Sequence, residues 1–334
     1  MKSAIVGCGG ISQVHARVLH DMENVELVAF ADIKPERAQK MVDAYGGRAY
    51  TSLEELLEKE SIDVLHICTP HYLHVPMAIA AMKKGVNVLM EKPPAMTKAQ
   101  KQEIFDCKAA HPEVTLGVSF QNRYNGATCY VKDLLDSGKA GAIKGARAIV
   151  TWSRGDKYYT ESGWRGTWET EGGGVLINQS IHTLDMLVYL LGEPKQVEAH
   201  VCNHHLKGVI EVEDTAEAYI DFGDKTALFY ATTAYCTDSP VLVELVCENM
   251  TLQLGPNDVW VISPDGKREH IEFDTNTVFG KGYWGGGHNA LIHDLYECIE
   301  TGKKFRLDIF EAMRALDLML GIYDSSAAGE PVEL

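Results

Sequence analysis

The sequence predicts two domains: an α/β domain with a doubly wound parallel sheet at residues 1–120, and an α+β domain with an open, largely antiparallel mixed sheet at residues 121–334. The first 120 residues alternate between short apolar runs of strand length and longer amphipathic runs of helix length, which is the pattern of parallel βαβ units. Residues 197–273 hold successive strand-like runs with no helical run between them, which favours antiparallel pairing. The total of 334 residues also exceeds the usual size of one domain.

The first element is a short apolar strand, Lys2–Val6, that turns through glycines into a helix. Such a turn directs backbone N–H groups and the positive end of the helix dipole at one point, which suits a pyrophosphate. Gly7 permits the tight turn, and Gly9 lets the backbone approach the phosphates with no Cβ in the way. The sequence therefore predicts a Rossmann dinucleotide-binding domain. The residues expected to contact the dinucleotide here are Gly7, Gly9, Gly10, Ile11 and Ser12.

The second strand, residues 25–31, ends at Asp32, about 20 residues beyond the glycine turn, where an acidic residue accepts hydrogen bonds from the adenosine ribose. A carboxylate at this position should repel the 2′-phosphate of NADP by up to about 4 kcal/mol. We therefore predict NAD as the cofactor, with NADP disfavoured. Two alternatives stay open: Asp32 could instead cap the helix that starts near Pro35, and Arg37 could accept the phosphate of NADP.

The remaining elements of the first domain continue the alternation. They are a helix at 35–45, a strand at 48–51, a helix with Ser52 as its N-cap, a strand at 62–67, a helix at 75–84, a strand at 86–90, a helix at 98–110 and a strand at 114–120. Ligands bind at the carboxyl ends of the strands in an open α/β sheet. Thr69 and Pro70 follow one strand there and are expected to contact the cofactor. Lys92 follows the next strand.

The second domain begins with a helix at 127–137 and a strand at 143–152. One strong helix follows at 175–191. Strands are then expected at 197–202, 216–222, 227–234, 241–247 and 259–262, before two final helices at 288–300 and 309–327.

Two groups of residues could carry chemistry. Lys92 could hydrogen-bond a substrate hydroxyl and stabilise an alkoxide; the alternative is a surface lysine at a strand end. In the helix predicted at 175–191, Asn178, His182 and Asp185 share one face. His182 could remove a hydroxyl proton while Asp185 or Asn178 orients its ring. The alternative is a buried histidine that is satisfied by its neighbours.

Aromatic residues and arginines between these groups suggest substrate contact, because aromatic faces pack on the C–H faces of sugars and arginines bind carboxylate or phosphate. A hydrophobic lid or an oligomer contact is the alternative. The residues singled out are Arg154, Trp164 and Arg165, and, after Tyr283 and Trp284, His288. The alternative for His288 is a capping or solvent-facing histidine.

Composition excludes several classes of protein. The formal net charge of −16 argues against nucleic acid or an anionic membrane as a partner. Eight cysteines without a Cys-x-x-Cys pair give no support to zinc fingers, dithiol redox motifs or a zinc alcohol dehydrogenase. His71 and His74 lack a third and fourth ligand, so no metal is predicted. No apolar run reaches the ~20 residues of a membrane span, and the opening run is too short for a signal segment. A reducing cytoplasm is expected.

These motifs resemble the Gfo/Idh/MocA family of NAD(P)-dependent sugar and cyclitol oxidoreductases over nearly the whole chain. The resemblance is carried by Gly7-Cys8-Gly9-Gly10-Ile11-Ser12, Cys68-Thr69-Pro70 with His74, Glu91-Lys92-Pro93, and the spacing of Asn178, His182 and Asp185. It implies that His74, Glu91 and Lys92 belong to the cofactor site and that Lys92 and His182 act at the substrate alcohol. It also implies a homodimer or homotetramer contact through the C-terminal sheet. Many relatives have aspartate in place of Asn178, so the general base stays open between His182 and Lys92.

The predicted function is reversible hydride transfer between NAD and a secondary hydroxyl of a sugar, sugar derivative or cyclitol, with the nicotinamide at the crevice between the domains. One alternative is an enzyme that retains NAD and uses transient oxidation for elimination or glycoside cleavage. Another is a sugar- or NAD-binding regulator without catalysis.

Overall fold

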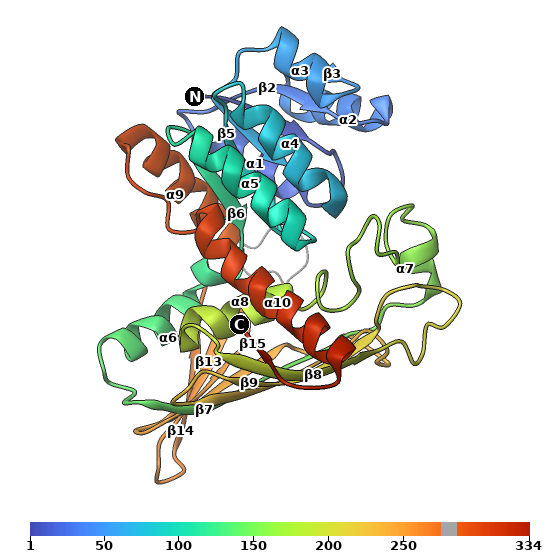
Figure 1. The fold of residues 1–334 in the computed structure, drawn as a ribbon. Coiled ribbons are helices and arrows are strands. Elements are labelled where there is room, and N and C mark those ends of the chain that lie inside the picture. Colours follow the sequence, from blue (N-terminus) through green and yellow to red (C-terminus); the bar gives the residue numbers. More distant parts are fainter. Residues whose placement is uncertain (275–285) are drawn as a thin grey trace. The chain divides into compact units, whose positions relative to one another are not determined.

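The computed structural model describes residues 1–274 and 286–334, which form two compact units (Figure 1). Unit 1 comprises Met1–Phe120 with His288–Met313, and unit 2 comprises Gln121–Gly287 with Arg314–Leu334. The division predicted at residue 120 therefore needs one correction, because residues 288–313 return to the first unit. The backbone N–H of Val118 donates to the carbonyl of Leu307 at 3.1 Å, which attaches this segment beside the edge strand of unit 1.

Unit 1 contains a six-stranded sheet in the order β3-β2-β1-β4-β5-β6, in which every neighbouring pair is parallel. This is the strand order of a doubly wound Rossmann domain, the class of fold that the sequence predicts. The strands are β1 (Lys2–Val6), β2 (Glu26–Ala31), β3 (Arg48–Tyr50), β4 (Val64–Ile67), β5 (Asn87–Glu91) and β6 (Leu116–Ser119). Residues of β4 and β6 are buried throughout, as expected for parallel strands covered on both faces.

The helices of unit 1 begin where the sequence supplies caps. Pro35 occupies the first turn of α2, and the side chains of Ser52 and Thr97 each accept a backbone N–H at 3.1 Å at the starts of α3 and α5. The N-cap predicted at Ser52 is confirmed. The elements are α1 (Ser12–Asp21), α2 (Pro35–Tyr45), α3 (Leu53–Lys59), η1 (His71–Leu73), α4 (His74–Met82), α5 (Lys98–Ala110) and α9 (Gly287–Thr301), followed by α10 (Ile309–Ala328), which runs on into unit 2.

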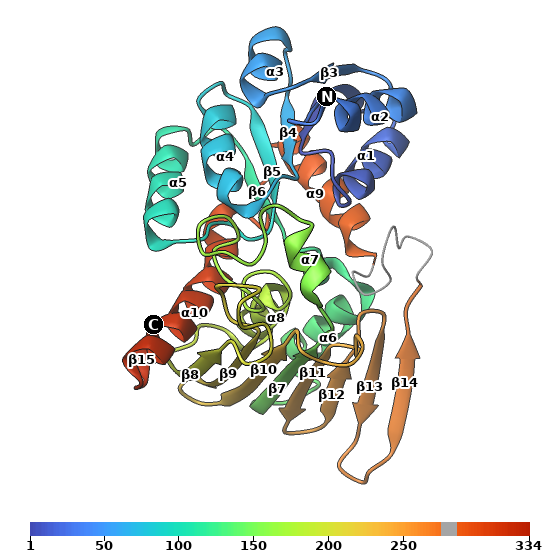
Figure 2. The same ribbon diagram turned by 90° about the vertical axis from the view of Figure 1, so that its right-hand side faces the viewer.

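Unit 2 contains a nine-stranded sheet in the order β14-β13-β12-β11-β7-β10-β9-β8-β15, seen strand by strand in Figure 2. Only the β7–β10 pair is parallel, so the predicted mixed, largely antiparallel sheet is confirmed. The strands are β7 (Ile143–Thr151), β8 (Gln196–Cys202), β9 (Thr215–Asp221), β10 (Thr226–Thr232), β11 (Leu242–Cys247), β12 (Thr251–Leu254), β13 (Asp258–Ile262), β14 (Arg268–Glu272) and β15 (Val332–Glu333). The sequence did not predict β12, β14 or β15, which are short or lack an apolar pattern.

The two faces of this sheet differ. Helices α6 (Gly126–Asp136) and α8 (Ile181–Leu191) lie on one face (Figure 1). Large apolar side chains stand exposed elsewhere on the sheet strands: Tyr219, Leu228, Tyr230, Val246 and Trp260. The unit also contains η2 (Gln121–Tyr124) and α7 (Asp156–Thr160). In the part of the chain that the structure describes, each helix is too short or too polar to cross a bilayer.

The helix predicted at residues 175–191 is wrong at its start, because α8 begins only at Ile181. The residues before it form turns. Their backbone N–H groups are taken by a residue far along the chain: the carboxylate of Glu213 accepts those of Gly174 and Leu176, each at 3.0 Å. The carbonyl of Glu213 also accepts the N–H of Val175 at 3.2 Å. These bonds hold the segment out of helical geometry despite its apolar sequence.

Candidate active site

The glycine turn between β1 and α1 forms an open cradle. Gly7 has a φ of 87°, and a Cβ built there would lie 2.6 Å from the carbonyl of Cys68, so the position requires glycine. A Cβ built at Gly9 or Gly10 would meet nothing within 4 Å. The Ser12 hydroxyl donates to the Gly9 carbonyl at 2.7 Å and ties the turn to the first residue of α1. Open space in front of a helix N-terminus, lined by bare backbone, fits a pyrophosphate.

Asp32 lies directly after β2 and beside this turn. Its Oδ2 accepts the backbone N–H of Cys8 and its Oδ1 that of Lys34, both at 2.8 Å. The N-cap residue of α2 is Lys34, which settles the open alternative: Asp32 does not cap that helix. Each carboxylate oxygen keeps a lone pair that could accept a ribose hydroxyl.

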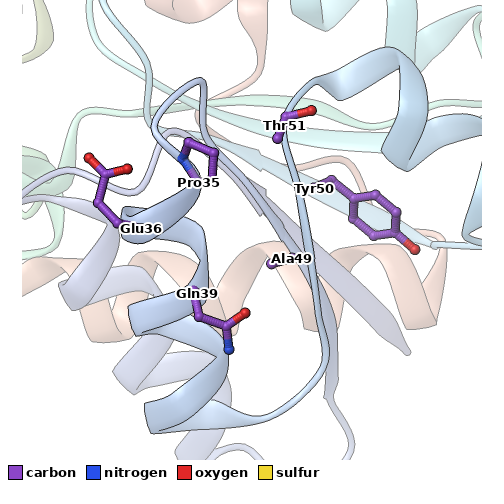
Figure 3. A pocket seen from close by; sticks show the side chains of 6 residues that line it. All are labelled: Pro35, Glu36, Gln39, Ala49, Tyr50 and Thr51. Carbon is purple, nitrogen blue, oxygen red and sulfur yellow. The ribbon is translucent and has the colours of Figure 1, made fainter.

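A small cavity of about 270 Å³ lies nearby, between α2 and β3 (Figure 3). It is lined by Pro35, Glu36, Gln39, Ala49, Tyr50 and Thr51. The carbonyl of Tyr50 accepts the N–H of Asp32 at 3.2 Å, which places this cavity next to the predicted ribose-binding carboxylate.

The segment after β4 contains a buried hydroxyl that the protein does not satisfy. Within the described residues, the Oγ1 of Thr69 has no hydrogen-bond partner. A buried unsatisfied polar group costs about 1–3 kcal/mol, so a ligand atom at this position would be stabilising. The backbone N of Thr69 is among the atoms closest to the Cβ built on Gly7, so this segment adjoins the glycine turn. The residues present therefore fit a dinucleotide.

His74, at the start of α4, has its ring between two backbone segments. Its Nε2 lies 2.9 Å from the carbonyl of Thr69 and its Nδ1 lies 3.0 Å from that of Pro93. A neutral imidazole donates only one N–H, so only the protonated ring can donate to both carbonyls. Burial disfavours the protonated ring and lowers the pKa of His74. Both ring nitrogens of His74 are therefore occupied by the protein, and the cofactor contact expected for this residue stays a prediction. His74 joins the segments that follow β4 and β5.

Glu91 also points into the interior, where it ends a chain of buried hydrogen bonds. Its Oε1 lies 3.0 Å from His15 Nε2, His15 Nδ1 lies 2.8 Å from His66 Nδ1, and His66 Nε2 lies 3.0 Å from the hydroxyl of Tyr296. That hydroxyl lies 2.6 Å from Ser3 Oγ. Every contact is satisfied if Ser3, Tyr296, His66 and His15 each donate to the next group, with both rings neutral and Glu91 ionised.

The electrostatics agree with this direction of donation. Burial would raise the pKa of Glu91, but the hydrogen bond from His15 outweighs it and holds that pKa well below its usual range. Burial, together with His15, lowers the pKa of His66 well below its usual range. The Oε1 atom of Glu91 is therefore held by His15 in the interior, and the role of Glu91 at the cofactor stays a prediction. His15 and His66 were missed as a pair, although His66 interrupts the apolar run of β4 and could have signalled a polar interior.

His288, in the first turn of α9, belongs to the same region of unit 1. Its ring centroid lies 6.0 Å from that of His15, it is 4% exposed, and burial lowers its pKa to about 4. It is therefore not the solvent-facing histidine that the sequence left open. Ligand atoms of His15, Glu91 and His288 lie within 4.8 Å of one another, but a metal there would have to break the bond between His15 and Glu91. Tyr283 and Trp284 lie outside the described residues.

Lys92 directly follows β5, at the carboxyl end of the parallel sheet, and is half-buried. The Lys92–Pro93 peptide is cis. This is the edge of an open α/β sheet at which ligands bind.

In unit 2, His182 occupies the first turn of α8 and is half-buried. Asp185, one turn later, is fully buried, and its Oδ2 and Oδ1 accept from Arg123 Nε at 2.9 Å and Nη2 at 2.6 Å. This bidentate ion pair joins α8 to η2. The sequence did not identify Arg123 as its partner.

Asn178 lies in the turn before α8, so it does not share the helix face predicted with His182 and Asp185. Its amide N–H group donates to the carboxylate of Glu171 and to the hydroxyl of Tyr158, the latter at 3.3 Å. Glu171 is fully buried and also accepts the backbone N–H of Gly166 at 2.6 Å. Asn178 therefore links two loops of unit 2.

The aromatic segment gathers around Tyr158. The guanidinium of Arg165 lies 4.4 Å from the ring centroid of Tyr158 and 4.5 Å from that of Trp164. The guanidinium of Arg154 lies 5.4 Å from the Tyr158 ring and pairs with Asp238 at 2.8 Å. Of the substrate residues that the sequence predicts, the structure thus brings Arg154, Trp164, Arg165 and Asn178 together around one tyrosine.

Two family models match the chain. Residues 1–120 match the model of an oxidoreductase family with an NAD-binding Rossmann fold, and residues 129–253 match that of the GFO/IDH/MocA C-terminal domain. The chain is 32% identical over 207 residues to the D-glucoside 3-dehydrogenase of Escherichia coli, covering 60% of this chain and 57% of that protein. It is 28% identical over 194 residues to the glucose-6-phosphate 3-dehydrogenase of Bacillus subtilis, covering 57% of this chain and 53% of that protein. The matched region thus spans little more than half the length of these curated relatives.

Among solved structures, the WlbA dehydrogenase from Bordetella pertussis, in complex with NADH and UDP-GlcNAcA, has a TM-score of 0.86 and 26% sequence identity. That likeness covers 100% of this chain and 98% of the other. The two family models follow one another along the chain, and the first covers the glycine turn, Asp32 and Lys92. The chain belongs to the Gfo/Idh/MocA family of oxidoreductases, and its residues 1–120 form an NAD-binding Rossmann domain.

Proposed function

We propose that this protein transfers a hydride between NAD and a secondary hydroxyl of a sugar, a sugar derivative or a cyclitol. The observation that carries the proposal is the open cradle at Gly9 and Gly10, which lies beside Asp32. Lys92 follows a strand of the same sheet, at the edge where ligands bind. The names of the relatives support the substrate class, because the matched curated enzymes are dehydrogenases of glucosides and glucose 6-phosphate.

In this proposal the cradle and the N-terminus of α1 hold the pyrophosphate, and Asp32 accepts hydrogen bonds from the adenosine ribose. Thr69 and Pro70 contribute to the same site, with the Thr69 hydroxyl available to a ligand atom. When bound, NAD supplies the hydride acceptor. The carboxylate of Asp32 disfavours NADP, because it would face the 2′-phosphate.

The chemistry is divided between two side chains. The ammonium of Lys92 donates a hydrogen bond to the reacting oxygen and stabilises the alkoxide, which lowers the pKa of the substrate hydroxyl. His182 takes the hydroxyl proton during oxidation and returns it during reduction. Asp185 acts through its ion pair with Arg123, which holds the helix that carries His182.

The test compares Lys92→Ala and His182→Ala with two exposed controls, Lys84→Ala and His293→Ala. NADH formation is followed by absorbance over a panel of sugars, uronates, aminosugars and inositols, and NAD binding is measured by calorimetry. Each active-site variant should lose roughly 10²–10⁴-fold in turnover while keeping its affinity for NAD. Near wild-type turnover in both would show the assignment to be wrong. Substrate conversion without net NADH would favour the NAD-retaining mechanism instead.

We also propose that the exposed face of the nine-stranded sheet joins copies of this chain into a homodimer or homotetramer. Leu228 is 60% exposed and Tyr219, its partner across the β9–β10 pair, is 47% exposed. Exposed apolar side chains gathered on one sheet are typical of interfaces. Light scattering should report a dimer or tetramer for the wild type and a smaller species for Leu228→Asp. A monomeric wild type would refute this interface.

The cysteines support a reducing compartment such as the cytoplasm. All eight lie within the described residues, and no disulfide joins any of them.

A further inference from the structure

Arg165 has no carboxylate partner in the part of the chain that the structure describes. Within residues 1–274 and 286–334, its Nε is buried without a hydrogen-bond acceptor. Several other arginines are paired with carboxylates: Arg48 with Glu60, Arg123 with Asp185, Arg147 with Glu244, Arg154 with Asp238 and Arg306 with Asp294. An uncompensated guanidinium in a chain of formal net charge −16 is a local cation with unused donors.

The surroundings of Arg165 hold it in place without using those donors. Its guanidinium lies 4.4 Å from the centroid of the Tyr158 ring and 4.5 Å from that of the Trp164 ring. The Tyr158 hydroxyl is fixed in turn by the amides of Asn178 at 3.3 Å and Gln179 at 3.1 Å. Aromatic contact of this kind engages the face of a guanidinium and leaves the N–H groups at its edge for a planar, bidentate acceptor.

The position of this cluster links it to the proposed chemistry. Asn178 and Gln179 lie in the turn that leads directly into α8, and His182 stands in the first turn of that helix. Arg154 adds a second guanidinium, 5.4 Å from the Tyr158 ring, whose partner Asp238 is partly exposed. The arginines and the proposed base are thus carried by adjoining segments of the same unit.

We infer that Arg165, supported by Tyr158 and Trp164, binds an anionic group of the substrate, so that the substrate is an acidic sugar or cyclitol rather than a neutral one. The inference rests on the proposed function, because it assumes that the bound ligand is the compound that is oxidised. A carboxylate and a phosphate share the required chemistry, since both offer two oxygens to one guanidinium.

The experiment uses glucose, its uronic acid and its phosphate ester as probes, with the NAD-loaded protein. Wild type, Arg165→Met and Arg165→Lys are compared, and Arg268→Met serves as the matched control, because Arg268 also lies over a tryptophan, at 5.8 Å from the Trp260 ring. Thermal melting checks that each variant is folded. Kinetics of NADH formation and calorimetric binding are measured for each probe.

The wild type should prefer at least one acidic probe over glucose by roughly tenfold or more in kcat/KM. Arg165→Met should abolish that preference by raising the KM for the acidic probe far more than the KM for glucose. Arg165→Lys should recover part of it, because it restores charge without the bidentate geometry. The acidic probe that is preferred identifies the anion as carboxylate or phosphate. Equal use of acidic and neutral probes, or an unchanged response in Arg165→Met, would overturn the inference.

Calorimetry separates this inference from the proposed function. If no probe is oxidised but an acidic probe binds and Arg165→Met loses that binding, the subsite stands and the proposed reaction on these compounds fails. If glucose is oxidised and no acidic probe binds, the proposed function stands and the anion subsite is refuted. If no acidic probe either binds or reacts, the subsite is refuted as well.

Discussion

Replacement of Gly9 by alanine should separate NAD binding from folding. The backbone at Gly9 does not occupy the left-handed region, and a Cβ there meets no protein atom within 4 Å. The stability of the protein should therefore change by no more than about 0.5 kcal/mol. The same Cβ would project into the open space in which the pyrophosphate is expected, next to backbone N–H groups.

The expected loss of affinity follows from the distances involved. A phosphate oxygen that accepts a backbone N–H lies at about 2.7–2.9 Å, whereas contact with a methyl carbon needs about 3.5–4.0 Å. The methyl group would push the pyrophosphate outward and break at least one charge-assisted hydrogen bond, which contributes about 1.5–3 kcal/mol. The dissociation constant for NAD should therefore rise by roughly tenfold to more than a hundredfold.

Calorimetric titration with NAD and urea denaturation measure the two effects. Gly7→Ala is the matched control, because its Cβ would lie 2.6 Å from the Cys68 carbonyl and its φ of 87° disfavours any side chain. That variant should lose more than about 2 kcal/mol of stability. If Gly9→Ala binds NAD within about twofold of the wild type, the cofactor does not use this cradle and the reasoning fails.

Three further perturbations test the geometry of the site. Burial raises the pKa of Glu213 from 4.5 to about 7. Between pH 4.5 and pH 7 the folded state therefore binds more protons than the unfolded state. The contribution of Glu213 to the free energy of unfolding thus falls as the pH rises through this range. Glu213→Gln should remove roughly 3 kcal/mol of that pH dependence in urea denaturation across pH 4–8, and an unchanged slope would contradict it. Arg123→Met leaves the buried carboxylate of Asp185 unpaired and should cost about 3–5 kcal/mol of unfolding free energy, whereas a cost near zero would mean that the pair does not anchor α8. Asp32→Asn should weaken the preference for NAD over NADP in steady-state kinetics with each cofactor; an unaltered ratio would show that this carboxylate does not face the ribose.

The sequence was most informative where structure is local. The N-cap at Ser52 and the exact span of α2 follow from residues that lie side by side in the chain. The glycine turn is equally local, since Gly7 alone allows the close approach to Cys68. By contrast, the start of α8 was wrong, because the apolar pattern of residues 175–180 resembles a helix and contains no sign of the carboxylate that binds their N–H groups.

The roles of individual polar residues also depend on contacts between residues that lie far apart in the chain. Glu91 and His74 belong to recognisable motifs, yet their side chains face His15 and two backbone carbonyls rather than open space. Arg165 was expected among the residues that contact substrate. The sequence could not show that it has no carboxylate partner among the described residues, because that depends on where the fold puts each Asp and Glu side chain.

The sequence by itself determined the class of the fold, the dinucleotide turn and the residue types available for chemistry, since these depend on contiguous apolar patterns and on glycines at fixed spacing. Only the tertiary structure decided which charges meet. Glu213 and Gly174 are 39 positions apart in the chain, Arg123 and Asp185 are 62 apart, and His15 and Glu91 are 76 apart. A buried charged group needs a partner, and that partner can come from any part of the chain that the fold brings near. Neighbouring residues in the sequence therefore do not indicate which partner it is.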